Sequence, residues 1–140
     1  MESHELRVRE SFSRQEMMKT LGAELSAVSN GATEIRFPCA VSLTQQHGFV
    51  HAGAVTAALD SACGYAALTV APEGSEVLSV EFKVNLLAPA TGETIIARAQ
   101  VKRAGKKLTV CTGDAFALRP EGEKLIATML ATMIFVPLER

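Results

Sequence analysis

Residues 51–71 form the longest nearly continuous apolar run of this chain, HAGAVTAALDSACGYAALTVA. A run of about 20 apolar residues is long enough to cross a membrane as a helix. Two features oppose a membrane span: Asp60 near the middle, which is costly in hydrocarbon, and a composition rich in Ala rather than Leu. We therefore predict a helix from about Ala52 that is buried inside a globular domain, with no membrane partner.

Four segments with strand character follow this helix, each separated from the next by a short turn-forming stretch. They span residues 77–88, 93–103, 108–118 and 124–136. Short connections favour antiparallel neighbours, so we expect a four-stranded antiparallel meander. In the first segment apolar residues alternate with polar ones from Leu78 to Leu86, which places Ser79 on the face opposite the apolar row.

The N-terminal third predicts a short helix and a hairpin. Residues 1–10 are mostly polar and are expected to be a flexible tail. A helix should begin at Ser11 or Ser13 and stop at Gly22, and Asn30-Gly31 should join strands 23–28 and 33–39. The whole chain, 1–140, is therefore expected to be one α+β domain, with a curved antiparallel sheet against one long helix.

Composition excludes several classes of function. Fourteen Lys and Arg balance fifteen Asp and Glu, with no basic stripe, so a nucleic-acid partner has no electrostatic support. The three cysteines form no CxxC pair, which argues against a disulfide framework or a zinc knuckle. His47 and His51 lack a third ligand at metal-site spacing, so we expect no metal. With no signal peptide, a reducing cytoplasm is the expected location.

The central helix combines a carboxylate with an accessible helix start. Asp60 shares a helix face with small residues, so its side chain must be hydrogen-bonded or face a cavity or another subunit. At the other end, His51-Ala52-Gly53 offers backbone N–H groups at the positive end of the helix dipole, where a polarised carbonyl oxygen can bind. Oxyanion stabilisation beside a carboxylate nucleophile or base is one interpretation, and a structural aspartate at a close helix contact is the other.

Three stretches resemble the hotdog-fold acyl-CoA thioesterases of the PaaI and 4-hydroxybenzoyl-CoA thioesterase type. They are HGFVHAGAVTAALDSA, LSVEFKVNLLAPATGETIIARAQV and GKKLTV. The resemblance covers about residues 20–137 and implies a hotdog fold. It also implies a homodimer or homotetramer, with Asp60 of one chain facing the helix start of the other.

Carried over by position, the resemblance implies roles for individual residues. Asp60 is the catalytic carboxylate, the N–H of Ala52 binds the thioester oxygen, and Gly53 packs beside it. The side chain of Gln45 approaches the thioester or the attacking water, and Ser79 matches a hydroxyl that helps to place water in some members. For His51, apart from the resemblance, the alternatives are capping of loop carbonyls and an orienting role rather than proton transfer. Relatives have Gly where this chain has Ala52, but a methyl group keeps the N–H. Gly64 stands where some aryl-CoA enzymes have Ser or Thr.

A basic turn is the candidate site for the nucleotide end of coenzyme A. Arg103, Lys106 and Lys107 flank Gly105, and two or three cations there could meet phosphates, although a solvated turn is the plain alternative. The resemblance implies CoA contacts at this turn and at Asn85, at the end of the preceding strand.

The expected activity is hydrolysis of an acyl- or aryl-CoA thioester to free acid and coenzyme A, with no cofactor beyond the substrate's own CoA. The alternatives are a non-catalytic acyl-CoA binder and a hotdog hydratase or dehydratase. A binder would have no need for the carboxylate of Asp60.

Overall fold

The Ala-rich segment forms the central helix α3 (Ala52–Leu68), with His51 as its N-cap residue. Ten of its 17 residues are buried. Small side chains on α3 and a glycine on the sheet allow a close approach: a methyl group added at Gly113 would lie 3.1 Å from the Cys63 sulfur and 3.2 Å from a Leu59 methyl carbon. The buried central helix expected from the apolar run is confirmed.

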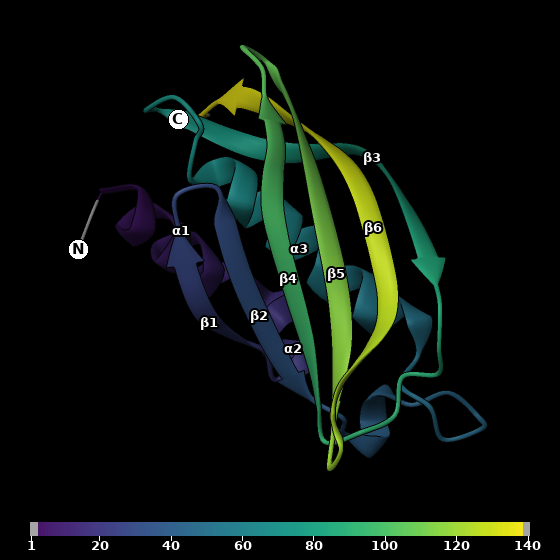
Figure 1. Cartoon of the computed structure of the whole chain (residues 1–140). Coiled ribbons are helices and arrows are strands. Elements are labelled where there is room, and N and C mark those ends of the chain that lie inside the picture. Colours follow the sequence, from purple (N-terminus) through teal and green to yellow (C-terminus); the bar gives the residue numbers. More distant parts are fainter. Residues whose placement is uncertain (1–2, 139–140) are drawn as a thin grey trace.

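The computed structural model describes residues 3–138, and in them six strands form one antiparallel sheet. The strands are β1 (Glu24–Ser29), β2 (Ala32–Pro38), β3 (Ser75–Leu86), β4 (Thr94–Ala104), β5 (Leu108–Arg119) and β6 (Gly122–Pro137). Their order across the sheet is β1-β2-β4-β5-β6-β3. Figure 1 shows the long strands curving around α3, which is the hotdog arrangement that the resemblance implies.

Strand β3 does not pair with β4, so the predicted four-stranded meander is wrong. β4, β5 and β6 do form a meander, but β3 pairs with β6 and forms the far edge of the sheet. Both edges of β4 are occupied, one by β5 and the other by β2. The connection after β3 therefore passes the start of α3, where the Ala90 carbonyl accepts a hydrogen bond of 2.9 Å from the Val50 N–H.

A β-bulge at Val80 changes which side chains of β3 face the helix. Ser79 pairs with Met133 and Glu81 with Thr132, so Val80 is an extra residue on β3. Met133 is fully buried against α3, and Ser79 therefore lies on the helix side of the sheet, whereas Leu78 lies on the outer side and is 58% exposed. The predicted uninterrupted alternation from Leu78 to Leu86, with Ser79 on the far face, is wrong for this reason.

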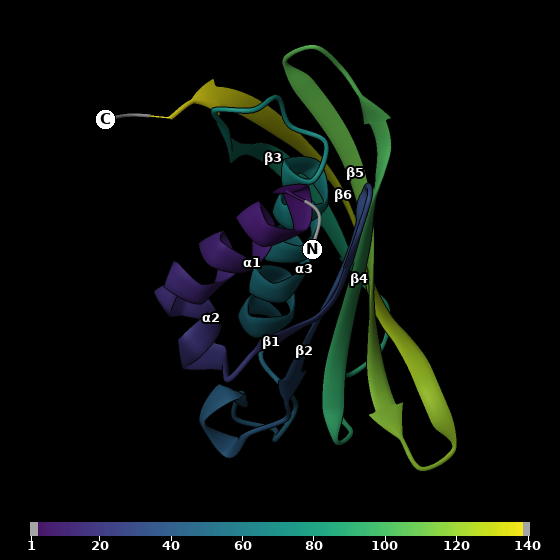
Figure 2. The same ribbon diagram turned by 90° about the vertical axis from the view of Figure 1, so that its left-hand side faces the viewer.

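The N-terminal segment is helical, which corrects the flexible tail expected for residues 1–10; residues 1 and 2 lie outside the described range. Helices α1 (Ser3–Arg14) and α2 (Glu16–Leu21) replace the single predicted helix, and Figure 2 shows both on the side of α3 away from the sheet. Val8 is fully buried. The Arg7 guanidinium donates to the carbonyls of Leu68, Ala71 and Pro72, where the negative end of the α3 dipole favours a cation.

Two predicted glycine positions are confirmed. Gly22 ends α2 in the left-handed conformation at φ 69°, and Gly31 at φ 77° completes the turn between β1 and β2. Among residues 3–138 no helix is long and apolar enough to cross a membrane.

Candidate active site

The first turn of α3 leaves one backbone donor accessible. The Gly53 N–H donates to Nδ1 of the His51 side chain at 2.7 Å. The N–H groups of Ala54 and Val55 donate to the His51 carbonyl at 3.0 and 3.4 Å. Within residues 3–138 the Ala52 N–H has no acceptor, so it can receive a ligand oxygen at the positive end of the helix dipole.

His51 and Gly53 together set this geometry. The imidazole accepts a hydrogen bond from a helix N–H and so orients the helix start. A methyl group at Gly53 would lie 3.0 Å from His51 Nδ1. Glycine at this position therefore keeps the cap in place.

Gln45 lies beside the helix start in an ordered loop. Its side-chain oxygen accepts hydrogen bonds from the backbone N–H groups of His47 (2.6 Å) and Phe49 (3.2 Å). These bonds fix the side chain and leave its amide N–H groups as donors. The loop, the helix start and the β3–β4 connection line a hollow of about 570 Å³, whose walls include Gln45, Phe49, Ala52, Leu86 and Pro89.

Asp60 lies beside a second hollow, of about 190 Å³, between α1, α3 and β3. The Ser79 hydroxyl donates to Asp60 Oδ1 at 2.6 Å, so the carboxylate is held by the strand next to its helix. One oxygen is fixed by this bond, and the half-buried carboxylate borders the hollow. The structure thus brings together Asp60 and Ser79, two of the residues singled out from the sequence.

The carboxylate and the free N–H lie far apart in one chain. Asp60 is eight residues after Ala52 on the same helix. At a rise of 1.5 Å per residue, the separation along the axis is about 12 Å. The two groups line different hollows and cannot contact one carbonyl group from within a single subunit.

The predicted CoA contacts do not line either hollow. Asn85 pairs with Thr128 on the outer face of the sheet. The turn that holds Arg103, Gly105, Lys106 and Lys107 joins β4 to β5, and it lies at the opposite end of these strands from the start of α3 (Figure 1). Arg103, Lys106 and Lys107 are exposed. Within one chain, the β4–β5 turn is therefore far from the start of α3.

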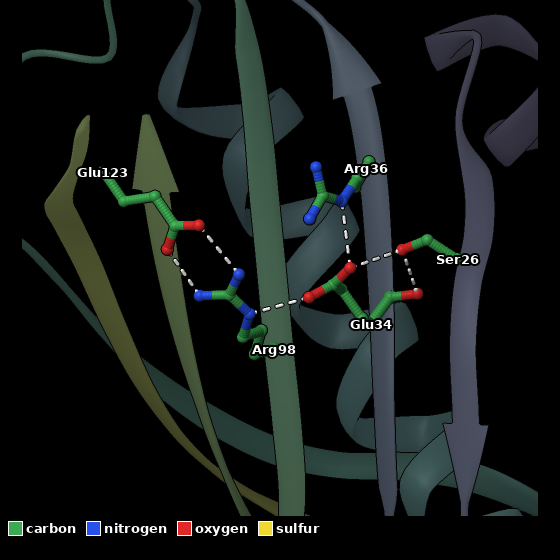
Figure 3. Close-up of polar contacts among 5 residues, drawn as sticks. All are labelled: Ser26, Glu34, Arg36, Arg98 and Glu123. Carbon is green, nitrogen blue, oxygen red and sulfur yellow. Dashed lines mark hydrogen bonds and ion pairs between the residues drawn. The ribbon is translucent and has the colours of Figure 1, made fainter. Parts of the chain in front are cut away.

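A network of charged side chains crosses the outer face of the sheet (Figure 3). Arg98 donates two hydrogen bonds to Glu123 (2.6 and 2.9 Å) and one to Glu34 (2.7 Å), and Glu34 also accepts from Arg36 (2.9 Å) and Ser26 (2.8 Å). Burial raises the pKa of Glu34, but these bonds outweigh burial and lower it to about 2. The sheet separates this network from Asp60, and its charged side chains are paired with one another.

No described cysteine is prepared for nucleophilic attack. Burial raises the pKa of the Cys63 thiol far above its usual range, and it raises that of Cys111 to about 11. All three cysteines are free. Within residues 3–138 no group of three or more His, Cys, Asp or Glu side chains is placed to hold a metal ion.

Sequence reasoning missed three polar residues beside Asp60. Gln15, Ser61 and Tyr65 line the same hollow, and the Gln15 amide donates to the Tyr65 hydroxyl at 2.9 Å and accepts from Ser61 at 3.2 Å. Ser61 and Tyr65 are one helical turn apart on α3, which was a usable signal. No local pattern predicts that Gln15, at the break between α1 and α2, docks there.

Comparisons with known proteins agree with this architecture. The family model of the thioesterase superfamily matches residues 47–123, which is more than half of the chain. A thioesterase family protein from Silicibacter pomeroyi is 48% identical in its crystal structure, with a TM-score of 0.95 over 97% of this chain and 100% of that one.

Two more distant structures share the fold. Thioesterase HI1161 from Haemophilus influenzae is 24% identical, with a TM-score of 0.81 over 94% of this chain and 89% of its own. The PaaI protein from the phenylacetic acid degradation operon of E. coli is 18% identical, with a TM-score of 0.84 over 95% and 93% of the two chains.

Proposed function

Because this chain belongs to the thioesterase superfamily and is a thioester hydrolase, we propose that it converts an acyl- or aryl-CoA thioester to free acid and coenzyme A. The observation that carries this proposal is the hydrogen bond from Ser79 to Asp60 beside an open hollow. A carboxylate needed only for packing would not require a cavity next to it. The reaction needs no cofactor, since coenzyme A is part of the substrate.

Asp60 supplies the reacting carboxylate. As a general base it takes a proton from water, the hydroxide attacks the thioester carbon, and the departing CoA thiolate receives that proton. As a nucleophile it attacks the same carbon directly, expels the thiolate and forms an anhydride that water then hydrolyses. In both routes Ser79 is a positioning residue, because its hydroxyl fixes one carboxylate oxygen and leaves the other for the reaction.

The Ala52 N–H is the proposed oxyanion donor. Negative charge develops on the thioester oxygen during attack, and a preorganised N–H at a helix start stabilises that charge. His51 acts by capping Gly53, which keeps this first turn in shape. The amide of Gln45, fixed by its two loop hydrogen bonds, supplies a further donor to the thioester oxygen or to the attacking water.

The site is proposed to form between two copies of the chain. Within one subunit Asp60 and the Ala52 N–H are about 12 Å apart along α3, so a single thioester group needs Asp60 from one copy and the helix start from the other. Strand β3 supports the pairing, since it is an open sheet edge. It carries exposed apolar residues, Leu78 (58%), Val80 (54%) and Phe82 (42%).

The nucleotide end of coenzyme A would meet cations from another subunit. Arg103, Lys106 and Lys107 lie too far from the helix start of their own chain, but an oligomer, either a dimer or a dimer of dimers, can bring them to a neighbouring site. Asn85, on the outer face, would reach CoA only in the same way. The free cysteines suit a reducing compartment, and we place the enzyme in the cytoplasm.

The test follows thiol release from a panel of short-chain, long-chain and aryl-CoA thioesters. The wild type should release CoA from at least one of them. Asp60→Asn, which keeps the shape and removes the charge, should lower kcat by about 100-fold or more. Asp114→Asn is the matched control, because Asp114 is exposed and bonds Thr128 on the outer face of the sheet.

Two outcomes would overturn the proposal. Full turnover by Asp60→Asn would remove the assigned carboxylate mechanism. A wild-type protein that binds these thioesters without releasing CoA would be a non-catalytic acyl-CoA binder.

A further inference from the structure

The second hollow, which lies beside Asp60 and is called the groove below, has one wall formed by the N-terminal helices. We propose that Gln15 is a specificity-determining residue, which selects a small acyl group with a hydrogen-bonding substituent. This inference rests on the proposed function, because it takes Asp60 to mark the thioester carbon. Three features of the groove support it: its shape on α3, the bonding of Gln15, and its size.

The positions along α3 give the groove two walls and a floor. Each helical residue turns about 100°, so Gly64 lies about 40° around the axis from Asp60, and Tyr65 lies about 140° from it. Asp60 therefore borders the β3 side, where Ser79 is, and Tyr65 borders the α1 side, where Gln15 is. Gly64 lies between them.

Gly64 leaves the floor of the groove open. Apart from its chain neighbours and the backbone of its own helix, a methyl group added at Gly64 would meet nothing within 4 Å. Glycine in a helix interior is destabilising relative to alanine, and here it gives space directly beside the carboxylate. An acyl group whose carbonyl carbon is at Asp60 can extend over Gly64 toward Tyr65.

Gln15 is placed for recognition rather than for capping. It occupies the N-cap position of α2 with extended backbone (φ −84°, ψ 107°), but its side chain makes no capping hydrogen bond. The side chain instead donates to the Tyr65 hydroxyl (2.9 Å) and accepts from the Ser61 hydroxyl (3.2 Å). The break between α1 and α2 thus directs this amide into the groove.

The wall formed by α1 is also held firmly. The Phe12 and Tyr65 rings meet edge to face at 5.9 Å, and Ser11 bonds the Tyr65 hydroxyl at 3.3 Å. Arg7 anchors α1 to the end of α3. A Gln side chain on such a wall keeps one amide hydrogen and one lone pair after its two bonds, so it can bind a hydroxyl or carbonyl substituent.

The size of the groove restricts the acyl group. Its volume is about 190 Å³, and a cavity of about 150 Å³ holds a benzene ring. A short chain or a single ring fits in this hollow beside Asp60. The polar walls, with Gln15, Ser61, Tyr65 and Glu76 among the lining residues, favour a substituent that forms hydrogen bonds.

The test compares butanoyl-CoA with 3-hydroxybutanoyl-CoA, which differ only in a hydroxyl that cannot expel CoA by forming a five-membered lactone. The wild type should prefer the hydroxylated substrate in kcat/KM by about threefold to tenfold, as expected for one hydrogen bond. Gln15→Leu should bring this ratio to about one, because the substituent then has no amide to bind. Gln100→Leu is the matched control, since Gln100 is exposed on β4 and does not line the groove.

A second variant keeps the test decisive if Gln15→Leu does not fold. Tyr65→Phe removes the hydroxyl that holds the Gln15 amide and keeps the ring against Phe12, so it should lower the same ratio. If the wild type is active and the folded variants keep its ratio of kcat/KM between the two substrates, Gln15 has no role in specificity. The proposed function would be unaffected by that result. A wild type that releases no CoA from any thioester would instead overturn the proposed function.

Discussion

The Ser79 hydroxyl lies 2.6 Å from Asp60 Oδ1 because the bulge at Val80 turns Ser79 toward the helix. Regular alternation with Phe82, Val84 and Leu86 on the helix side would point Ser79 at the outer surface instead. One extra residue in the strand therefore decides whether the carboxylate has a partner. Bulges are common beside active sites for this reason, since they re-aim a side chain without breaking the sheet.

Replacing Ser79 by Ala should lower kcat by about tenfold and leave KM nearly unchanged, because the carboxylate loses its orientation while substrate binding stays. Steady-state thiol release measures both constants. Ser29→Ala, at the exposed end of β1, is the control and should match the wild type. A Ser79→Ala enzyme with wild-type kcat would show that the hydrogen bond has no part in the reaction.

Replacing Ala52 by Pro removes the accessible N–H with little change to the fold. Proline is tolerated at the first position of a helix, and His51 already has the extended backbone (ψ 138°) that precedes proline. We expect a fall in kcat of about 100-fold or more, the usual effect of losing an oxyanion donor. Circular dichroism and thermal unfolding should stay close to the wild type, and undiminished turnover would place the oxyanion donor elsewhere.

Mixing two inactive variants tests whether the site spans two subunits. A heterodimer of Asp60→Asn and Ala52→Pro chains has one site in which Asp60 and the Ala52 N–H are both intact. After refolding together in equal amounts, the mixture should recover about a quarter of wild-type activity, because half of the dimers are mixed and each has one working site. Separately refolded samples combined afterwards are the control. No recovery in co-refolded dimers would mean that both groups act from the same chain.

The charge network on the outer face predicts acid sensitivity. The pKa of Glu34 is about 2 in the folded chain, against a usual value of 4.5. Because the folded pKa is lower, the stabilisation is complete above about pH 5 and is lost as the pH falls toward 2. Glu34→Gln should lower the free energy of unfolding by about 1–3 kcal/mol at pH 6.

Urea unfolding at pH 6, 4 and 3, at one protein concentration, measures this difference. The difference in free energy of unfolding between the wild type and Glu34→Gln should become steadily smaller as the pH falls. Glu121→Gln in the exposed β5–β6 turn is the control and should change stability little at any of these values. A gap that widens toward pH 3 would contradict the assigned direction of the pKa shift.

The central helix and most strands could be predicted from the residues alone, together with the hypothesis that Asp60 and the start of this helix form the site. The run of small residues predicts the central helix, and period-two patterns predict most strands. Asn30-Gly31 predicts a turn, and Gly22 predicts a helix end. Asp60 and the helix start at Ala52 were also recognisable, because a carboxylate and an open helix end have chemical consequences that are visible locally. These features depend on residues that are close together in the chain.

How the helices and strands meet depends on contacts between residues that are far apart in the chain. β3 lies beside β6 because β2 and β5 occupy both edges of β4, and Ser79 reaches Asp60 because of the bulge at Val80. α1 docks through Arg7 on carbonyls more than 60 residues away, which brings Gln15 to the groove. Such contacts depend on competition between distant partners for the same edge or helix end, and no local periodicity records the outcome of that competition.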